Sequence, residues 1–231
     1  MQLSERPKAL LSWSSGKDSA YALSVLREND AMDVVALVTT IDRRTRRVPV
    51  HFVRESVLDL QAQAVGLPLW KIEVDWPCPN VMYRAALQDI ADRAVREGIS
   101  HMAFGDLFLA DIRTYREEVV RAAGLEPIFP LWGRKTSDLA TRMLRAGVEA
   151  TVTCVDRTQL DSSFAGAAFD ATFLDQLPQG VDPCGENGEF HTVVCDGPGF
   201  VRPVPLRVGD IVEDGSFVVV DVQSATSVQG A

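Results

Sequence analysis

The chain has 231 residues, of which 46% are hydrophobic and 24% are charged, and its formal net charge is −9 at pH 7. This length suits one large domain or two small ones, and the composition is typical of a soluble globular protein. No apolar stretch approaches the roughly 18 residues of a membrane span, and the N-terminus lacks a signal-peptide pattern. We therefore predict a cytoplasmic protein that does not bind a membrane.

The acidic balance argues against a nucleic-acid partner, because neutralising phosphates requires clustered Lys and Arg. The basic segment 43–47, "RRTRR", is better explained as a solvated loop than as a phosphate-binding lip. The four cysteines form no CxxC pair, which argues against a structural metal site and favours buried, reduced thiols. The oligomeric state stays open, a homo-oligomer included.

In the first part of the chain, short apolar segments alternate with amphipathic ones. The former predict strands over 8–13, 33–40, 69–75, 101–106 and a last extended segment at 127–132. The latter predict helices over 19–26, 54–66, 81–97 and 112–124. The near-continuous apolar run "DVVALVTT" is typical of a parallel strand that is buried on both faces.

This alternation predicts an α/β fold with a doubly wound parallel sheet and right-handed crossovers. Ligands in such sheets bind at the carboxyl ends of the strands. Four polar or glycine-containing segments fall at these ends and are expected to face one crevice: 12–19, 39–42, 75–80 and 105–111.

The pattern changes after residue 131. A helix is predicted over 136–147 with Ser137 as N-cap, followed by a strand over 150–156. The proline-broken segment 200–223 is β-rich, and its "EDGS" is typical of a hairpin turn. We predict a smaller α+β domain over 132–231, after an α/β domain over 1–131, and a disordered tail at 224–231.

Small and polar residues gather where the first predicted strand meets the first predicted helix, in "SWSSGKDS". Backbone N–H groups at the positive end of a helix dipole bind anions. Gly16 allows a positive φ or the close approach of a ligand. The other groups available to an anion are the hydroxyls of four serines and one ammonium, from Ser12, Ser14, Ser15, Lys17 and Ser19. A simple turn capped by Asp18 or Ser19 is the alternative.

The segment is not a Walker A loop. That motif needs Gly five residues before its Gly-Lys, where this chain has Leu11, and Ser or Thr after the Lys, where it has Asp18.

"SSGKDS" instead resembles the PP-loop, SGGxDS, of ATP pyrophosphatases, with Ser15 in place of a glycine. Three further segments, "GDLFLADIRTYRE", "LWGRKTSDLATRMLRAG" and "DPCGENGEFHT", resemble in this order motifs of the diphthine–ammonia ligase family. The resemblance covers residues 9 to about 222. It implies an adenine nucleotide α-hydrolase-like (HUP-type) domain followed by a small C-terminal domain.

The resemblance also implies ATP-dependent amidation. In that reaction a carboxylate attacks the α-phosphate, pyrophosphate leaves, and ammonia displaces AMP from the acyl-adenylate. The implied cofactors and partners are ATP, Mg²⁺, ammonia and an unidentified carboxylate, either protein-borne or small. Residues 14–19 would cradle the pyrophosphate, with Lys17 stabilising its charge. Asp18 would hold Mg²⁺, or would merely cap the helix.

The glycine-punctuated loop "PCGENGEFHT" is expected to close over the crevice from the second domain. Glu186 or Glu189 would orient ammonia or deprotonate ammonium, and Asn187 and His191 are candidate substrate contacts. A surface turn of solvated carboxylates is the alternative.

Strand ends supply further candidate nucleotide contacts, namely Thr39, Gly105 and Asp106. Asp106 contacts Mg²⁺, ribose or substrate, or else it caps a loop. Arg113 and Arg116 lie one helical turn apart and are candidates to grip an anionic substrate, although a salt-bridging surface explains them too. His51 and His101 are expected to satisfy local hydrogen bonds.

Two other functions stay open. A PP-loop sulfur transferase acting on tRNA generally needs a sulfur-carrying cysteine and an RNA-binding surface, and the acidic charge and unpaired cysteines argue against both. A non-catalytic regulatory module that binds adenine nucleotide is the other alternative, but such modules lack a loop like "GENGEFHT".

Overall fold

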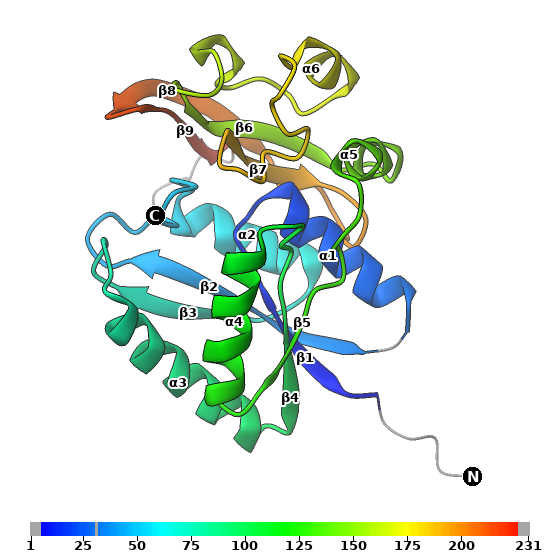
Figure 1. Ribbon diagram of the computed structural model, residues 1–231, viewed down its shortest axis with the longest axis vertical. Helices are drawn as coiled ribbons and strands as arrows, with labels where there is room; N and C mark the ends of the chain where they lie inside the picture. The colour runs from blue at the N-terminus through cyan, green and yellow to red at the C-terminus, as the bar shows by residue number, and fades with distance from the viewer. Residues whose placement is uncertain (1–5, 31, 226–231) are drawn as a thin grey trace, which may run out of the picture.

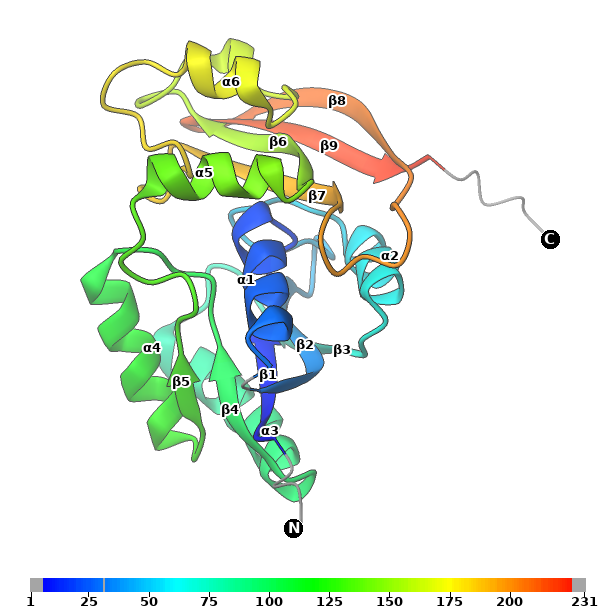
Figure 2. The ribbon, with the colours of Figure 1, turned by 90° about the vertical axis from the view of Figure 1, so that its right-hand side faces the viewer.

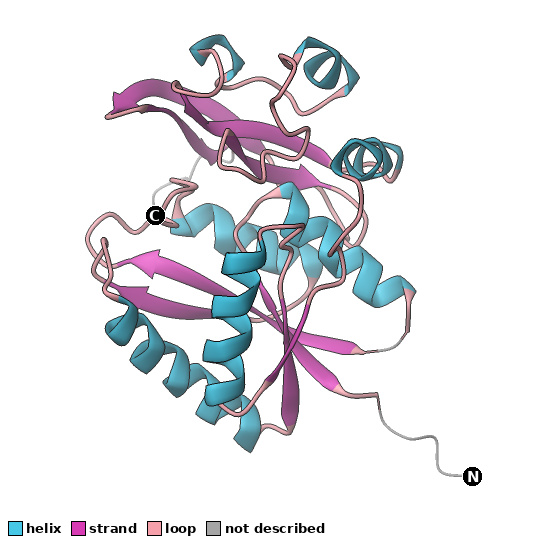
Figure 3. Ribbon diagram, in the orientation of Figure 1, coloured by secondary structure: helices cyan, strands magenta, loops and turns pink. Residues whose placement is uncertain are grey.

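The computed structural model describes residues 6–30 and 32–225. Figure 1 shows two sheets, one above the other, with helices on both faces of the lower sheet. Figure 3 separates the strands into the same two groups. Within the described ranges, no helix is long and apolar enough to cross a membrane.

The lower sheet is parallel and has five strands in the order β3-β2-β1-β4-β5. Its strands are β1 (Lys8–Ser12), β2 (Asp33–Asp42), β3 (Leu69–Val74), β4 (Ile99–Ala103) and β5 (Glu126–Ile128). The crossing helices are α1 (Lys17–Glu28), α2 (Glu55–Val65), α3 (Asn80–Arg96) and α4 (Ala110–Ala122). The predicted doubly wound α/β fold is therefore confirmed, and Gly66 ends α2 in the left-handed conformation expected of a C-cap.

The central strand β1 explains why the core sequence reads as continuously apolar. Leu10 and Leu11 are both fully buried, yet they belong to different buried clusters on opposite faces of the sheet. One cluster includes residues of α1 and α2, and the other includes residues of α3 and α4. A strand covered on both faces has no polar side, so it shows no alternation.

The upper sheet is antiparallel, with four strands in the order β7-β6-β9-β8. Its strands are β6 (Glu149–Asp156), β7 (Phe190–Asp196), β8 (Leu206–Asp214) and β9 (Phe217–Ser224). The helical segments are α5 (Thr136–Arg145), α6 (Ala171–Gln176) and a 3₁₀ turn, Ser162–Phe164. These elements match the predicted smaller α+β unit, and the predicted hairpin turn joins β8 to β9.

Two details differ from the sequence predictions. The N-cap of α5 is Lys135, not Ser137, because the last extended residue is Lys135 (ψ 121°) and Thr136 is already helical. The predicted disordered tail falls almost entirely outside the described residues, although Ser224 belongs to β9.

The two sheets are not separated by solvent. A single buried cluster contains Leu11 and Leu23 of the first part together with Val152 and Val193 of the second. In Figure 2, β7 lies directly against the N-terminal end of α1. The division at 131/132 stays a prediction, because the two parts share this cluster.

The basic segment 43–47 is held largely by carboxylates. Arg46 pairs with Glu55 and Glu73, and Arg47 pairs with Asp221 of β9. This segment therefore helps to join the two sheets.

All four cysteines are free, but only Cys154 and Cys184 are buried, so the expectation of buried thiols is wrong for the other two.

Candidate functional site

The loop between β1 and α1 presents open amides at a helix N-terminus. The N-cap of α1 is Gly16, which has no side chain to cap the helix, and one first-turn amide, that of Lys17, donates to the Thr192 hydroxyl. Neither Asp18 nor Ser19 caps the helix; the Ser19 hydroxyl donates to the carbonyl of Gly16 instead (2.9 Å). First-turn N–H groups have no partner within a helix, so this end keeps its capacity to bind an anion.

Gly105, which follows β4, keeps this amide face accessible. A Cβ at Gly105 would stand 3.0 Å from the backbone carbon of Asp18 and 3.1 Å from the nitrogen of Ser19. These distances are shorter than van der Waals contact, so a larger residue would press on the backbone of the first turn. Glycine is required here for close approach and not for its φ angle.

The left-handed residue of the loop is Ser15, with φ 77°, whereas Gly16 has φ −86°. Of the two roles considered for Gly16, the positive φ is therefore taken by the preceding residue instead. Gly16 is needed for space, because a Cβ there would lie 3.1 Å from the carbonyl oxygen of Thr192. Ser15 is fully buried, and its hydroxyl has no hydrogen-bond partner among the described residues.

Strand β7 and helix α2 hold the loop from behind. The carbonyl of Ser15 accepts from the Val194 amide (2.9 Å) and from Nε2 of the fully buried Gln61 (3.1 Å). The Thr192 hydroxyl accepts from the Lys17 amide (3.2 Å). Residues from the far end of the chain thus determine the shape of the loop.

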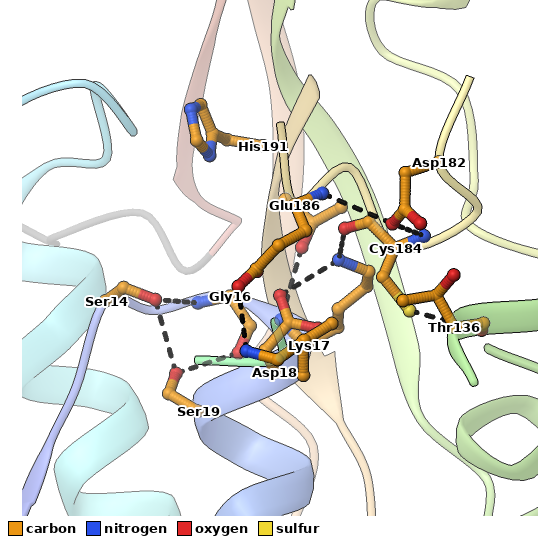
Figure 4. Close-up of polar contacts among 12 residues, drawn as sticks. Ser14, Gly16, Lys17, Asp18, Ser19, Thr136, Asp182, Cys184, Glu186 and His191 are labelled. Atoms are coloured by element: carbon orange, nitrogen blue, oxygen red, sulfur yellow. Dashed lines mark hydrogen bonds and ion pairs between the residues drawn. The ribbon is translucent and has the colours of Figure 1, made fainter. Parts of the chain in front are cut away.

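The buried Lys17 and the half-buried Asp18 form an ion pair, and Lys17 also reaches the second part of the chain (Figure 4). Lys17 Nζ lies 3.0 Å from Asp18 Oδ2 and donates to the Cys184 carbonyl. Burial by itself lowers the pKa of Lys17, but the nearby carboxylates of Asp18 and Glu186 outweigh burial and the net shift is upward. Lys17 is therefore a permanent cation in the pocket.

Glu186 lines the pocket and is held by the backbone that follows β4. Its Oε1 accepts from the Leu107 amide (2.7 Å) and more weakly from the Phe108 amide (3.4 Å). Burial raises the pKa of Glu186 to about 7; those two amides oppose the rise, and the negative charges of Asp18 and Asp106 add to it. A carboxyl with a pKa near neutrality suits general acid–base chemistry.

Glu189 has a different position from Glu186. It is 2% exposed, and its carboxylate accepts from the amides of Asp182 and Asn187 and from Nδ2 of Asn187. Neither Glu189 nor Asn187 lines the pocket. Both order the loop from within, as a buried carboxylate satisfied by N–H donors does.

Asp18 and Asp106 each direct an unpaired carboxylate oxygen inward. Asp18 Oδ1 and Asp106 Oδ2 are buried and lack hydrogen-bond partners among the described residues. Asp106 Oδ1 instead accepts from Arg116 Nε (2.9 Å). Unpaired carboxylate oxygens are costly to bury, and Mg²⁺ is typically held by one or two carboxylates plus phosphate oxygens. Two such oxygens are therefore candidate ligands of a divalent cation, although the described residues contain no group of three or more His, Cys, Asp or Glu side chains that could hold a metal ion by themselves.

The pocket gathers most, but not all, of the predicted residues. It is lined by Ser12, Ser14, Lys17, Asp18, Ser19, His51, Gly105, Asp106, Arg116, Cys184, Gly185, Glu186, Phe190, His191 and Thr192. Thr39 lies inside β2 and is buried. Arg113 lies outside, paired with Glu117 (2.7 Å) and packed on the rings of Phe129 and Trp132.

Sequence reasoning offered Arg113 and Arg116 together without choosing between them, and it left His51 out of the site. Arg116 lines the pocket one turn after Arg113, and no sequence signal separates the two residues. His51 was expected to satisfy local hydrogen bonds, but its Nδ1 is buried without a partner among the described residues. Its position depends on long-range packing against β7, which a single sequence does not reveal.

Comparison with known families decides the relationship. The model of the diphthamide synthase N-terminal domain matches residues 7–127, and that of the diphthamide synthase C-terminal domain matches residues 135–226. The chain belongs to the diphthamide synthase family.

Relatives within the diphthamide synthase family carry the name diphthine–ammonia ligase. The rat protein is 25% identical over 221 residues, covering 86% of this chain and 82% of the relative. The human protein is 26% identical over 176 residues, covering 69% and 66%. The fission yeast protein, Schizosaccharomyces pombe, is 25% identical over 223 residues and is much longer: the match covers 88% of this chain but 36% of the relative.

Among solved structures, a U34-tRNA thiolase from Methanococcus maripaludis aligns with a TM-score of 0.37 at 16% identity, over 62% of this chain and 59% of that chain. A likeness this slight says nothing about function.

We predict that Ser15→Gly stabilises the protein. The left-handed conformation costs a non-glycine residue roughly 1–2 kcal/mol, and the substitution also removes a buried hydroxyl that lacks a partner. Glycine's greater freedom in the unfolded chain offsets part of the gain. The free energy of unfolding, measured in urea, should rise by about 1 kcal/mol.

Ser14→Gly is the matched control, because Ser14 has an ordinary negative φ. It should lower the free energy of unfolding by about 0.5 kcal/mol. Equal effects of the two substitutions would contradict the strained conformation at Ser15.

Proposed function

We propose that this protein is an ATP-dependent ligase that adenylates a carboxylate, releases pyrophosphate and transfers ammonia to the activated acyl group. Membership of the diphthamide synthase family supports the ligase class. The observation that carries the proposal is that a helix N-terminus with a glycine N-cap, a buried lysine and a carboxyl with a near-neutral pKa lie at one pocket.

In the proposed adenylation, the bond between the α- and β-phosphates of ATP breaks, so negative charge develops on the departing pyrophosphate. The α1 amides and the Lys17 ammonium are already in place to stabilise that charge without rearrangement. Ser12, Ser14 and Ser19 line the pocket, and their hydroxyls are proposed phosphate contacts.

Asp18 Oδ1 and Asp106 Oδ2 are the proposed ligands of Mg²⁺. A divalent cation here would supply Lewis-acid charge stabilisation at the phosphates. Independently of the ion, Arg116 holds Asp106 through Oδ1 and leaves Oδ2 without a partner among the described residues.

Glu186 is the proposed general base of the second step. It accepts a proton from ammonium, the freed lone pair of nitrogen attacks the acyl carbon, and the bond from that carbon to the AMP oxygen breaks. The nitrogen then loses a second proton, which passes to solvent, and leaves the neutral amide. The proposed contribution of Glu189 and Asn187 is to keep the loop in the shape that presents Glu186.

The carboxylate substrate is either protein-borne or small. Diphthine, named in the relatives, is the first candidate to test. Neither Thr39 nor Arg113 lies in the pocket, so we propose that Arg116 replaces Arg113 as the cation nearest the substrate.

Sulfur transfer is disfavoured by the chemistry of the pocket thiol. Cys184 is 2% exposed, and burial raises the pKa of its thiol far above neutral. A thiol that stays protonated is a poor nucleophile and a poor carrier of sulfur.

The proposed function is tested by incubating the protein with MgATP, ammonium and candidate acids, diphthine-bearing protein among them, and by separating the nucleotide products. We expect AMP and pyrophosphate in equal amounts, formed only when acid and ammonium are both present. ADP and phosphate as products would contradict attack at the α-phosphate.

The pH dependence tests the role of Glu186. As a base it must be ionised, so amide formation should fall by about tenfold per pH unit below its pKa of about 7. Glu186→Gln should slow amide formation by about 10²–10⁴-fold and abolish this limb of the profile.

Glu118→Gln, at an exposed site on α4, is the matched control and should keep the wild-type profile. A wild-type profile in Glu186→Gln would show that another group is the base.

A further inference from the structure

Two of the three histidines meet in the pocket, although they are far apart in the chain. His51 lies in the loop between β2 and α2, and His191 lies in β7; their ring centroids are 4.3 Å apart. The Thr153 hydroxyl of β6 donates to the backbone carbonyls of both histidines, at 3.2 Å to His51 and 3.4 Å to His191. A common anchor therefore holds the pair.

The backbone around His51 is strained. Val50 has φ 67° and Phe52 has φ 58°, and such left-handed values are rare for β-branched and bulky residues. Hydrogen bonds from the His51 amide to the Pro49 carbonyl and from the Phe52 amide to the Val48 carbonyl close the turn. Strain of this kind persists where the surrounding structure imposes it, and it clusters at functional sites.

The pocket is short of positive charge for a triphosphate. Its two permanent cations, Lys17 and Arg116, are each already paired with a carboxylate, and Glu186 adds a third carboxyl. A bound triphosphate adds several negative charges. Among the described side chains that line the pocket, the two imidazoles are the groups that can gain a positive charge near neutral pH.

We propose that His51 and His191 contact the terminal phosphates of bound ATP and take up a proton as it binds. This inference rests on the proposed function, since it assumes that ATP occupies the pocket. His51 Nδ1, buried without a partner among the described residues, is the atom that a phosphate oxygen would satisfy. An imidazolium there would then stabilise pyrophosphate as it leaves.

The charges around the pair account for the direction of the proton transfer. Burial and the Lys17 ammonium lower the pKa of His191 to about 4, and burial, the neighbouring His191 and Lys17 lower that of His51. Both rings are therefore neutral before ATP binds, and phosphate charge shifts each pKa upward. The other charged or titratable groups near the pair are Asp18, Asp106, Arg116, Cys184 and Glu186 in the pocket, and Arg47 with Asp221 behind the His51 loop.

The test is calorimetric titration of the protein with MgATP at pH 6, in two buffers of different ionisation enthalpy, which gives the protons taken up per ATP bound. His51→Asn and His191→Asn are compared with wild type. His101→Asn is the matched control, because His101 lies in β4 beside Ser100 and outside the pocket. Protons exchanged by ATP itself are common to all four proteins.

We expect wild type and His101→Asn to take up the same amount of proton, and both pocket variants to take up less. Each pocket variant should also bind MgATP roughly tenfold more weakly at pH 6, with a smaller loss at pH 8. Thermal melting of each variant checks that it is folded. If His51→Asn does not fold, His191→Asn alone tests the proposal, because residue 191 lies in a regular strand.

Equal proton uptake in all four proteins would overturn the role of the pair and leave ATP binding, and hence the proposed function, intact. No binding of MgATP to wild type would overturn the proposed function and this inference together.

Discussion

The carbonyl oxygen of Ser15 is the point on which the site depends, because the loop and both sheets meet there. It accepts from the Val194 amide of the upper sheet and from Gln61 of α2. Gln61 is itself fully used: its Oε1 accepts from Trp13, and its Nε2 also donates to the Val194 carbonyl (2.7 Å). A buried network in which every member is satisfied specifies one geometry. The amide cradle is therefore a product of both sheets and not of the parallel sheet alone.

The same dependence on the second sheet appears in the charged groups. Lys17 belongs to α1, yet its ammonium lies against the Cys184 carbonyl and the rings of Phe169 and Phe190. Glu186 belongs to the loop before β7 in the second part of the chain, and its carboxylate accepts from the amides that follow β4 in the first part. Each part of the chain thus positions a charged group at the other, and one hydrophobic cluster holds the two parts together.

The sequence predicted those helices and strands whose residue patterns are local. Buried parallel strands and amphipathic helices each have their own periodicity, so the doubly wound sheet was predictable. The small residues of the loop and the polar residues before β7 were visible as motifs, and both lie at the pocket. The sequence predictions missed features that depend on long-range contacts. Strand β7 was not predicted, because it directly follows a polar loop. Ser137 was predicted as an N-cap from its residue type, but it lies inside a helix that begins earlier. Arg116 and His51 join the site only through tertiary packing, which no local pattern encodes.

The most direct test is an experimental structure of the protein with Mg²⁺ and the α,β-methylene analogue of ATP, which cannot lose pyrophosphate. The account predicts that the β- and γ-phosphates lie against the first-turn amides of α1, within reach of Lys17, with the metal between Asp18 and Asp106. A nucleotide bound elsewhere, or phosphates turned away from that helix end, would contradict it.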